Sequence, residues 1–239
     1  MHKSPDSTEL GNALRGTKAV ALSWHGVLFD RDRAAIHRAV TATFARWGVT
    51  VADAELRATR GPTGRPQIVR LLSIPRIAEE FRARKGRWAD TSDIEAMGRD
   101  LEPRLLAAAG EAPEPNPEAC EALRDLRARG IKTAVICCTP RRLLGPQLEA
   151  LAQSGVPVDC VVTADEACEP APAPWGIFDV LQKLGLATAS ELALVDDSPA
   201  GVTAARNAGV FGVALAVEGA PTGSDARAVI RSLSELAAR

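Results

Sequence analysis

Short apolar runs alternate with helical patterns along the second half of the chain. Each run has the length of one buried strand and is followed by apolar residues at helical spacing. This order predicts an α/β fold, a Rossmann-like doubly wound parallel sheet with helices on both faces. We expect strands at 132–138, 158–163, 192–196 and 210–217, and helices at 118–130, 141–153, 175–184, 199–208 and from about residue 224.

The first half of the chain has one further apolar run, residues 18–30, which ends in a polar turn. Only helical patterns follow it, until Pro113, Pro115 and Pro117 interrupt the chain. A helical segment therefore separates the first strand from the second. The helices predicted in this segment are 33–47, 53–59, 66–72, 75–84 and 92–109.

This arrangement predicts a core domain with a helical cap inserted after its first strand. The core consists of residues 17–32 and 113–239, and the cap consists of residues 33–112. Residues 1–16 mix Ser, Pro, Asp and Gly without periodicity, which is typical of a disordered tail.

Composition narrows the class of protein only a little further. Hydrophobic residues make up 46% of the 239 positions and charged residues 25%, as in ordinary globular proteins. A formal net charge of -1 gives no sign of a nucleic-acid or membrane partner. Because no apolar run approaches the roughly 18 residues of a membrane span and residues 1–17 lack a secretory signal, we expect a cytoplasmic protein. The five cysteines lack C-x-x-C spacing, which favours free thiols.

The predicted strands end in residues that can carry chemistry. Parallel sheets bind ligands at the carboxyl ends of their strands, so these residues should share one crevice although they are far apart in the sequence. The residues expected there are Ser23, His25, Cys137, Thr139, Asp196 and Asp197.

The first apolar run ends in Gly26-Val27-Leu28, with Asp30 two residues further on. This frame resembles the first motif of the haloacid dehalogenase (HAD) superfamily, D-x-D-G-[V/T]-L-x-D. Ser23 and His25 stand in the places of the two carboxylates of the motif. In the family the first Asp attacks phosphorus to form an aspartyl phosphate. Serine cannot form that intermediate, so the resemblance leaves open whether the protein is an enzyme.

Residues 195–201 resemble the fourth HAD motif, V-[E/D/G]-D-[S/T]-x-x-[G/D]. Ser198 is a good helix N-cap, and Pro199 suits the first helical position. The resemblance implies that Asp196 and Asp197 are magnesium ligands, because hard cations prefer oxygen donors. Alternatively, the two carboxylates only complement the positive end of the following helix.

Within the superfamily the chain is most similar to the phosphonoacetaldehyde hydrolase (phosphonatase) branch. That family uses a cap lysine to form a Schiff base with an aldehyde, and then passes the phosphoryl group to the first-motif Asp. The lysine position falls on Gln67 by one alignment and on Gly64 by another, and neither residue can form an imine. The stretches that carry the resemblance are 62–64, 75–81, 129–132 and 172–175.

The remaining phosphate-binding positions also depart from the family pattern. The second-motif Ser or Thr falls on Cys137, a weaker hydrogen-bond donor, and Thr139 replaces it only if the strand end shifts. The third-motif Lys or Arg falls on Ala171 or Glu169, and no basic residue occurs between 163 and 183. Efficient aspartyl-phosphate chemistry is therefore not expected.

One hypothesis is a phosphonatase-like protein that has lost this hydrolase chemistry and acts as a non-catalytic binding or regulatory scaffold. Trp24, Thr139 and Gln67 are its candidate ligand contacts, the ligand being an unidentified small molecule. In this hypothesis Mg²⁺ could still bind at Asp196 and Asp197, but more weakly than in the family. The resemblance to phosphonatases also implies a homodimer through the cap helix 33–47.

The alternative hypothesis is a HAD-like hydrolase of a small metabolite with changed chemistry. Residues two apart on a strand point the same way, so Ser23 and His25 could face one pocket with Asp197. They would act as nucleophile, base and orienter for acyl transfer. Cys137 replaces Ser23 as nucleophile if protonated His25 activates its thiol, and a transition metal at His25, Asp196 and Asp197 is a further variant. In the structural alternative Ser23 is a small filler, Cys137 a buried apolar residue and His25 a hydrogen-bonded turn residue.

Overall fold

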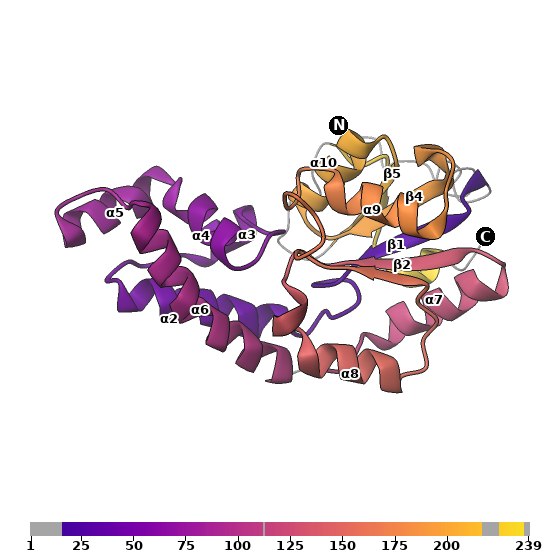
Figure 1. The fold of residues 1–239 in the computed structure, drawn as a ribbon, viewed down its shortest axis with the longest axis horizontal. Helices are drawn as coiled ribbons and strands as arrows, with labels where there is room; N and C mark the ends of the chain where they lie inside the picture. The colour runs from indigo at the N-terminus through magenta and orange to yellow at the C-terminus, as the bar shows by residue number, and fades with distance from the viewer. Residues whose placement is uncertain (1–15, 112, 217–224, 237–239) are drawn as a thin grey trace.

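A computed structural model describes residues 16–111, 113–216 and 225–236 (Figure 1). Within these residues the chain forms a six-stranded parallel sheet with the order β3-β2-β1-β4-β5-β6. The first strand, β1, thus lies inside the sheet between β2 and β4. The predicted fold class is confirmed. The strands are β1 Ala19–Ser23, β2 Lys132–Ile136, β3 Cys160–Val162, β4 Leu192–Asp196, β5 Phe211–Leu215 and β6 Ala228–Ile230.

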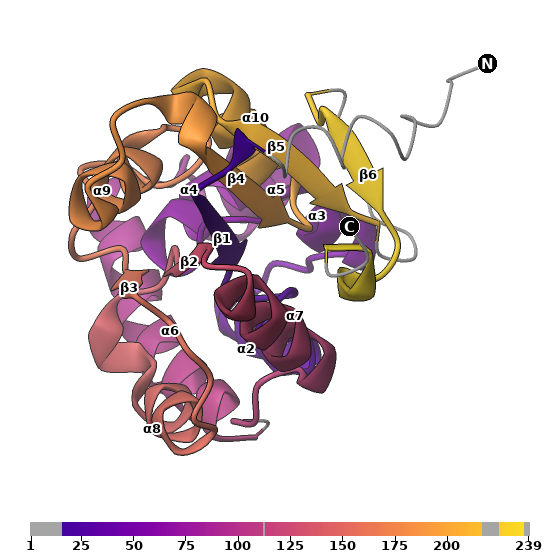
Figure 2. The same ribbon diagram turned by 90° about the vertical axis from the view of Figure 1, so that its right-hand side faces the viewer.

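Helices cover both faces of the sheet (Figure 2). Along β1, Val20 and Leu22 pack toward the side of α7 and α8, whereas Ala19 and Ala21 pack toward α9 and α10. Because both faces are buried, the strands are continuous apolar runs. Within the described ranges, no helix has the length and apolar character needed to cross a membrane. These covering helices are α7 Pro117–Ala128, α8 Gly145–Gln153, α9 Trp175–Leu184 and α10 Pro199–Ala208.

Helices α2 to α6, here called the helical insert, lie to one side of the sheet (Figure 1). They share an apolar cluster that includes Phe44, Phe81 and Met97, and Leu143 from the segment before α8 joins it. The division into a core domain and a cap domain stays a prediction. The helices of the insert are α2 Arg33–Arg46, α3 Asp53–Ala58, α4 Arg65–Leu72, α5 Pro75–Lys85 and α6 Thr91–Glu111.

Some predicted boundaries differ from the structure near the strand ends. The strand predicted at 132–138 ends at Ile136, because the chain turns there to form the loop that carries Cys137. The helix predicted at 141–153 is divided into a short 3-10 helix, Arg141–Leu143, and α8, whose first residues are Gly145 and Pro146. The disordered tail predicted for 1–16 lies, except for its last residue, outside the described residues.

The helix predicted from about residue 224 is wrong. Residue 224 lies outside the described ranges, and the residues that follow form strand β6, Ala228–Ile230, beside β5. Two of its three residues are β-branched and favour a strand, and the open edge of β5 offers backbone partners. Among the described residues after the strand, Leu233–Leu236 form a 3-10 turn, and both of its leucines are buried against α7.

Candidate functional site

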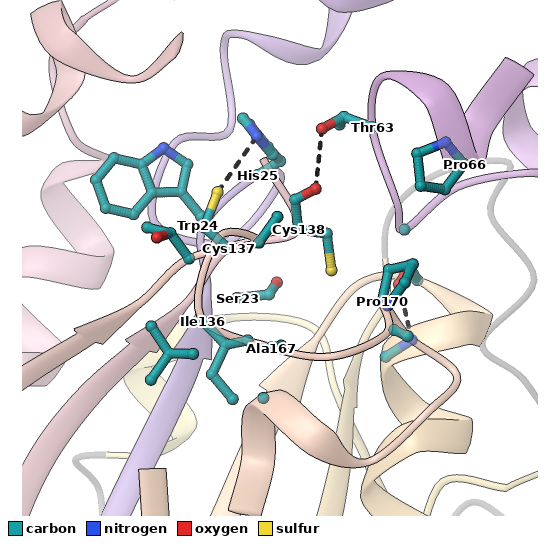
Figure 3. A pocket seen from close by; sticks show the side chains of 18 of the residues that line it. Ser23, Trp24, His25, Thr63, Pro66, Ile136, Cys137, Cys138, Ala167 and Pro170 are labelled. Atoms are coloured by element: carbon teal, nitrogen blue, oxygen red, sulfur yellow. Dashed lines mark hydrogen bonds between the residues drawn. The ribbon is translucent and has the colours of Figure 1, made fainter. Parts of the chain in front are cut away.

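A cavity of about 380 Å³ lies at the carboxyl ends of the strands, between the sheet and the helical insert (Figure 3). It is the crevice that the sequence predicted. Thr139 does not line this cavity but is hydrogen-bonded to His25, and Gln67 is buried in α4 without lining the cavity. The other predicted site residues all line the cavity, namely Ser23, Trp24, His25, Cys137, Asp196 and Asp197.

Ser23 is the last residue of β1, and the motif resemblance assigns it the position of the nucleophilic Asp. Its side chain lines the cavity, and its Oγ has no hydrogen-bond partner among the described residues. The chain turns at Gly26, whose φ of 81° favours glycine. A Cβ at this position would also overlap the guanidinium of Arg33 and the carboxylate of Asp197. The tight turn thus keeps Ser23 at the cavity and lets Arg33 approach the loop.

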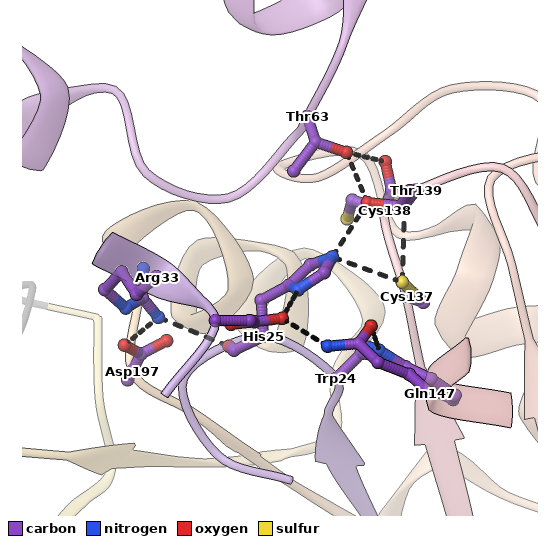
Figure 4. Close-up of polar contacts among 10 residues, drawn as sticks. Trp24, His25, Arg33, Thr63, Cys137, Cys138, Thr139, Gln147 and Asp197 are labelled. Atoms are coloured by element: carbon purple, nitrogen blue, oxygen red, sulfur yellow. Dashed lines mark hydrogen bonds and ion pairs between the residues drawn. The ribbon is translucent and has the colours of Figure 1, made fainter. Parts of the chain in front are cut away.

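His25 is held in a hydrogen-bond network (Figure 4). Its Nδ1 lies 2.5 Å from Asp32 Oδ2, and its Nε2 lies 2.8 Å from Thr139 Oγ1. Burial by itself lowers the pKa of His25, but attraction to Asp32 and Cys137 outweighs burial and raises it to about 10. His25 is therefore a protonated imidazolium at neutral pH, and both of its N–H groups are donated to neighbours.

Further hydrogen bonds fix this network on both sides. Gln147 Nε2 donates to Asp32 Oδ2 at 2.8 Å, and Trp24 Nε1 donates to Gln147 Oε1 at 2.8 Å. On the other side, the hydroxyl of Thr139 is hydrogen-bonded to that of Thr63, which belongs to the loop before α4. The network therefore links the end of β1 to α8 and to the helical insert (Figure 4).

Two thiols follow β2 at the cavity. Cys137 Sγ lies 3.7 Å from His25 Nε2 and accepts a hydrogen bond from Thr139 N at 3.4 Å. The sulfur of Cys138 lies in the cavity (Figure 3). Burial raises the pKa of Cys138 to about 12, so this thiol is neutral. All five cysteines are free, as the sequence predicted.

The two carboxylates after β4 are both engaged by the protein itself. Asp196 Oδ1 accepts a hydrogen bond from Ser198 N at 2.7 Å, and Asp197 forms an ion pair with Arg33. Nη2 of the same arginine lies 3.3 Å from the carbonyl oxygen of His25. Burial and the adjacent Asp197 raise the pKa of Asp196 to about 7. Ser198 caps α10, as the sequence predicted.

The residues present do not fit a divalent cation. The resemblance to the HAD superfamily implies Mg²⁺ at Asp196 and Asp197. Within the described part of the chain, no group of three His, Cys, Asp or Glu side chains could hold a metal ion. Arg33 Nη2 already lies between two oxygens of the kind that Mg²⁺ prefers, the Asp197 carboxylate and the His25 carbonyl. The positive charge at this position therefore comes from the chain.

The loop before α9 brings no positive charge to the cavity. Both positions considered for the third-motif base, Glu169 and Ala171, line the cavity, and neither is basic. The carbonyl oxygen of Ala171 instead accepts a hydrogen bond from Arg70 Nη2 of α4 at 3.0 Å. This arginine therefore ties the helical insert to the loop, and the bond uses one of its nitrogens.

The structure brings His25 next to Cys137 and leaves Ser23 without either of its proposed partners. Both ring nitrogens of His25 are engaged elsewhere, and Asp197 pairs with Arg33. The acid that orients His25 is Asp32, which the motif pattern did not indicate. An Asp directly before a helix suggests an N-cap, but Asp32 forms no side-chain cap bond to α2.

Residues 12–209 match the family model of the haloacid dehalogenase-like hydrolases. Phosphonoacetaldehyde hydrolase from Nitratidesulfovibrio vulgaris is 30% identical over 227 residues, which cover 93% of this chain and 80% of the relative. That from Paraburkholderia xenovorans is 28% identical over 206 residues, covering 86% and 77%. The crystal structure of a phosphonoacetaldehyde hydrolase-like protein from Oleispira antarctica has a TM-score of 0.79 at 24% identity, covering 84% of this chain and 72% of that one. The chain therefore belongs to the haloacid dehalogenase-like hydrolase family and is related within it to the phosphonoacetaldehyde hydrolases.

Proposed function

We propose that this protein has lost aspartyl-phosphate chemistry and acts as a non-catalytic binding or regulatory scaffold. The observation that carries the proposal is Ser23 at the end of β1, in the place of the nucleophilic Asp. A serine hydroxyl cannot form an aspartyl phosphate. Its Oγ also has no base within hydrogen-bonding distance among the described residues. Nucleophilic attack on phosphorus from this position therefore has neither the family's carboxylate nor an activating partner.

The other positions of the family's reaction support the same conclusion. Of the two candidate positions for the Schiff-base lysine, Gln67 has a neutral amide that is buried away from the cavity, and Gly64 lines the cavity but has no side chain. Ala171 and Glu169 supply no cation for a phosphoryl group. Loss of one transition-state donor typically costs about 3 to 4 kcal/mol, or roughly a hundred- to thousandfold in rate. Several such losses together leave no route to efficient turnover.

Phosphate release from phosphonoacetaldehyde, measured with Mg²⁺ present, tests this proposal. The Paraburkholderia xenovorans relative serves as the positive control in the same assay. We expect this protein to release no phosphate above the buffer, and also to leave p-nitrophenyl phosphate intact. Turnover that Ser23→Ala abolishes would overturn the proposal, because it would show that this side chain takes part in catalysis.

A second candidate function is hydrolysis with Cys137 as the nucleophile. The observation that favours it is the contact of 3.7 Å between Cys137 Sγ and Nε2 of the protonated His25. A neighbouring imidazolium stabilises a thiolate, which is the nucleophilic form of cysteine. Asp32 would orient His25 in this arrangement. Exclusion from solvent acts against it, because Cys137 is only 3% exposed.

Alkylation by iodoacetamide at pH 7, followed by mass spectrometry, separates the two candidates. The exposed Cys168 provides the reference rate for an ordinary thiol. Modification of Cys137 faster than Cys168, and dependent on His25, would support a live nucleophile. We expect Cys137 to react more slowly than Cys168, and we expect a fluorophosphonate probe to leave Ser23 unlabelled.

A further inference from the structure

The inner part of the cavity has an apolar wall. Below the strand ends it extends between the sheet and the layer formed by α9 and α10, where its lining residues belong to the apolar cluster of that layer. Its volume of about 380 Å³ lies within the range of about 300 to 1,000 Å³ that is typical of small-molecule sites. The apolar residues that form this inner wall are Ile136, Val162, Ala171, Ile177, Leu194 and Ala204.

Each arginine that lines the cavity already has an acidic partner. Besides the pair of Arg33 with Asp197, Arg142 forms an ion pair with Glu102 at the cavity rim. Arg65 lies 3.6 Å from Glu95, and both of these side chains are about half exposed. A phosphate or carboxylate ligand would have to break the buried pair of Arg33 with Asp197, whereas the two exposed pairs cost little to break. It would also meet Glu169, an acidic side chain of the lining. The charges around the cavity therefore disfavour an anion.

One buried polar group at the cavity is left without a partner. Ser23 is 8% exposed, and its Oγ accepts and donates no hydrogen bond among the described residues. The thiol of Cys138 also lines the cavity (Figure 3), and it is neutral and a weak donor. A buried hydroxyl that lacks a partner is unfavourable, and a ligand that hydrogen-bonds to it removes that cost.

We propose that this cavity binds a neutral, mainly apolar small molecule whose one hydrogen-bonding group meets Ser23 Oγ. The inference rests on the proposed loss of phosphate chemistry and names the class of ligand that the altered site selects. The apolar body of the ligand would lie against the inner wall, toward Ile177 and Leu194. Phosphorylated analogues would bind more weakly, because the lining has acidic side chains and its arginines are already paired.

A matched pair of probes, 2-naphthol and 2-naphthyl phosphate, tests the inference by isothermal titration calorimetry, with 1-octanol as a second neutral probe. The full chain is titrated with each probe at neutral pH. Ala167→Phe fills the cavity from its lining, and Ala128→Phe adds the same side chain at an exposed position of α7 as a control. Ser23→Ala removes only the hydroxyl, and circular dichroism confirms the folding of each variant.

We expect saturable binding of 2-naphthol and 1-octanol, and at least tenfold weaker binding of 2-naphthyl phosphate. Ala167→Phe should weaken the neutral probes at least tenfold, whereas Ala128→Phe should change little. Ser23→Ala should weaken 2-naphthol by about two- to twelvefold, the size of one net hydrogen bond. If Ser23→Ala binds 2-naphthol as tightly as the wild type does, the hydroxyl of the ligand does not meet Ser23 Oγ.

The same probes separate failure of this inference from failure of the proposed function. No binding of either neutral probe, or tighter binding of intact 2-naphthyl phosphate, would overturn the ligand class and leave the loss of catalysis standing. Hydrolysis of 2-naphthyl phosphate, detected by the fluorescence of released 2-naphthol and abolished by Ser23→Ala, would overturn the proposed function itself.

Discussion

Replacement of Asp32 by Asn tests the buried pair that organises the loop after β1. The side chains of His25 and Asp32 are 14% and 1% exposed, and Nδ1 lies 2.5 Å from Oδ2. Asn keeps the shape of Asp and removes its charge, so the imidazolium loses its counterion. Burial, which lowers the pKa of His25, is then no longer offset by Asp32. We expect the His25 pKa to fall in the variant.

The pKa of His25 gives the size and the pH range of the effect. A rise from 6.5 to about 10 corresponds to roughly 5 kcal/mol at about 1.4 kcal/mol per pKa unit. Removal of one partner from a buried ion pair costs about 3 to 5 kcal/mol. Because the folded pKa lies above the unfolded value, the stabilisation is complete below about pH 6.5 and is lost as the pH rises through about 10. We expect Asp32→Asn to lower the free energy of unfolding by about 3 kcal/mol at pH 6.

Urea unfolding at pH 6, 8 and 10 measures this difference, with histidine NMR to follow the titration of His25. Asp30→Asn is the matched control, because Asp30 is exposed. The difference in the free energy of unfolding between wild type and Asp32→Asn should become smaller as the pH rises. Asp30→Asn should have the same free energy of unfolding as the wild type at each pH. If Asp32→Asn lowers the free energy of unfolding by less than 1 kcal/mol at pH 6, or by an amount that does not depend on pH, the His25–Asp32 ion pair is not the contact that organises this loop.

Two further substitutions test the tight turn at Gly26 and the ion pair of Arg33 with Asp197. Gly26→Ala should lower the free energy of unfolding by more than Gly130→Ala, measured by urea unfolding. Both glycines have positive φ, 81° and 76°, which costs an Ala about 1 to 2 kcal/mol, but only a Cβ at Gly26 meets Arg33. Equal losses of unfolding free energy in the two variants would show that a Cβ at Gly26 does not clash with Arg33. Arg33→Ala should add a Mg²⁺-dependent rise in Tm that wild type and the exposed control Arg31→Ala lack, because it frees the oxygens of Asp197 and His25. A Mg²⁺-dependent rise in wild type would contradict the role of Arg33.

Local signals along the chain were sufficient for most of the fold and for the position of the site. The turn after β4 was predictable because Ser198 and Pro199 have strong preferences for the start of a helix. The crevice was predictable because parallel strands end at one edge, whatever lies between them in the sequence. The last strand was missed because β6 depends on its neighbour β5 and has only a short apolar run of its own.

The contacts that decide the chemistry could not be read from the sequence. Arg33 and Asp197 are 164 positions apart, and they meet only because the helical insert packs against the strand ends. The hydrogen bond between Gln147 and Asp32 likewise forms only because α8 packs close to the loop after β1. The expectation that Ser23 and His25 face one way assumed an extended strand, but β1 ends at Ser23 and the loop then turns back on itself. Such contacts depend on tertiary packing and leave no local pattern.

If the site has lost more than its nucleophile, Ser23→Asp will not restore phosphate release. This substitution restores the attacking carboxylate and leaves Cys137, Ala171 and Gln67 unchanged. Phosphate release from phosphonoacetaldehyde and p-nitrophenyl phosphate is measured with Mg²⁺, after circular dichroism has shown that the variant is folded. We expect no release above the buffer, because Ala171 and Glu169, at the third-motif positions, supply no cation for the phosphoryl group. Substantial turnover by Ser23→Asp would contradict this expectation.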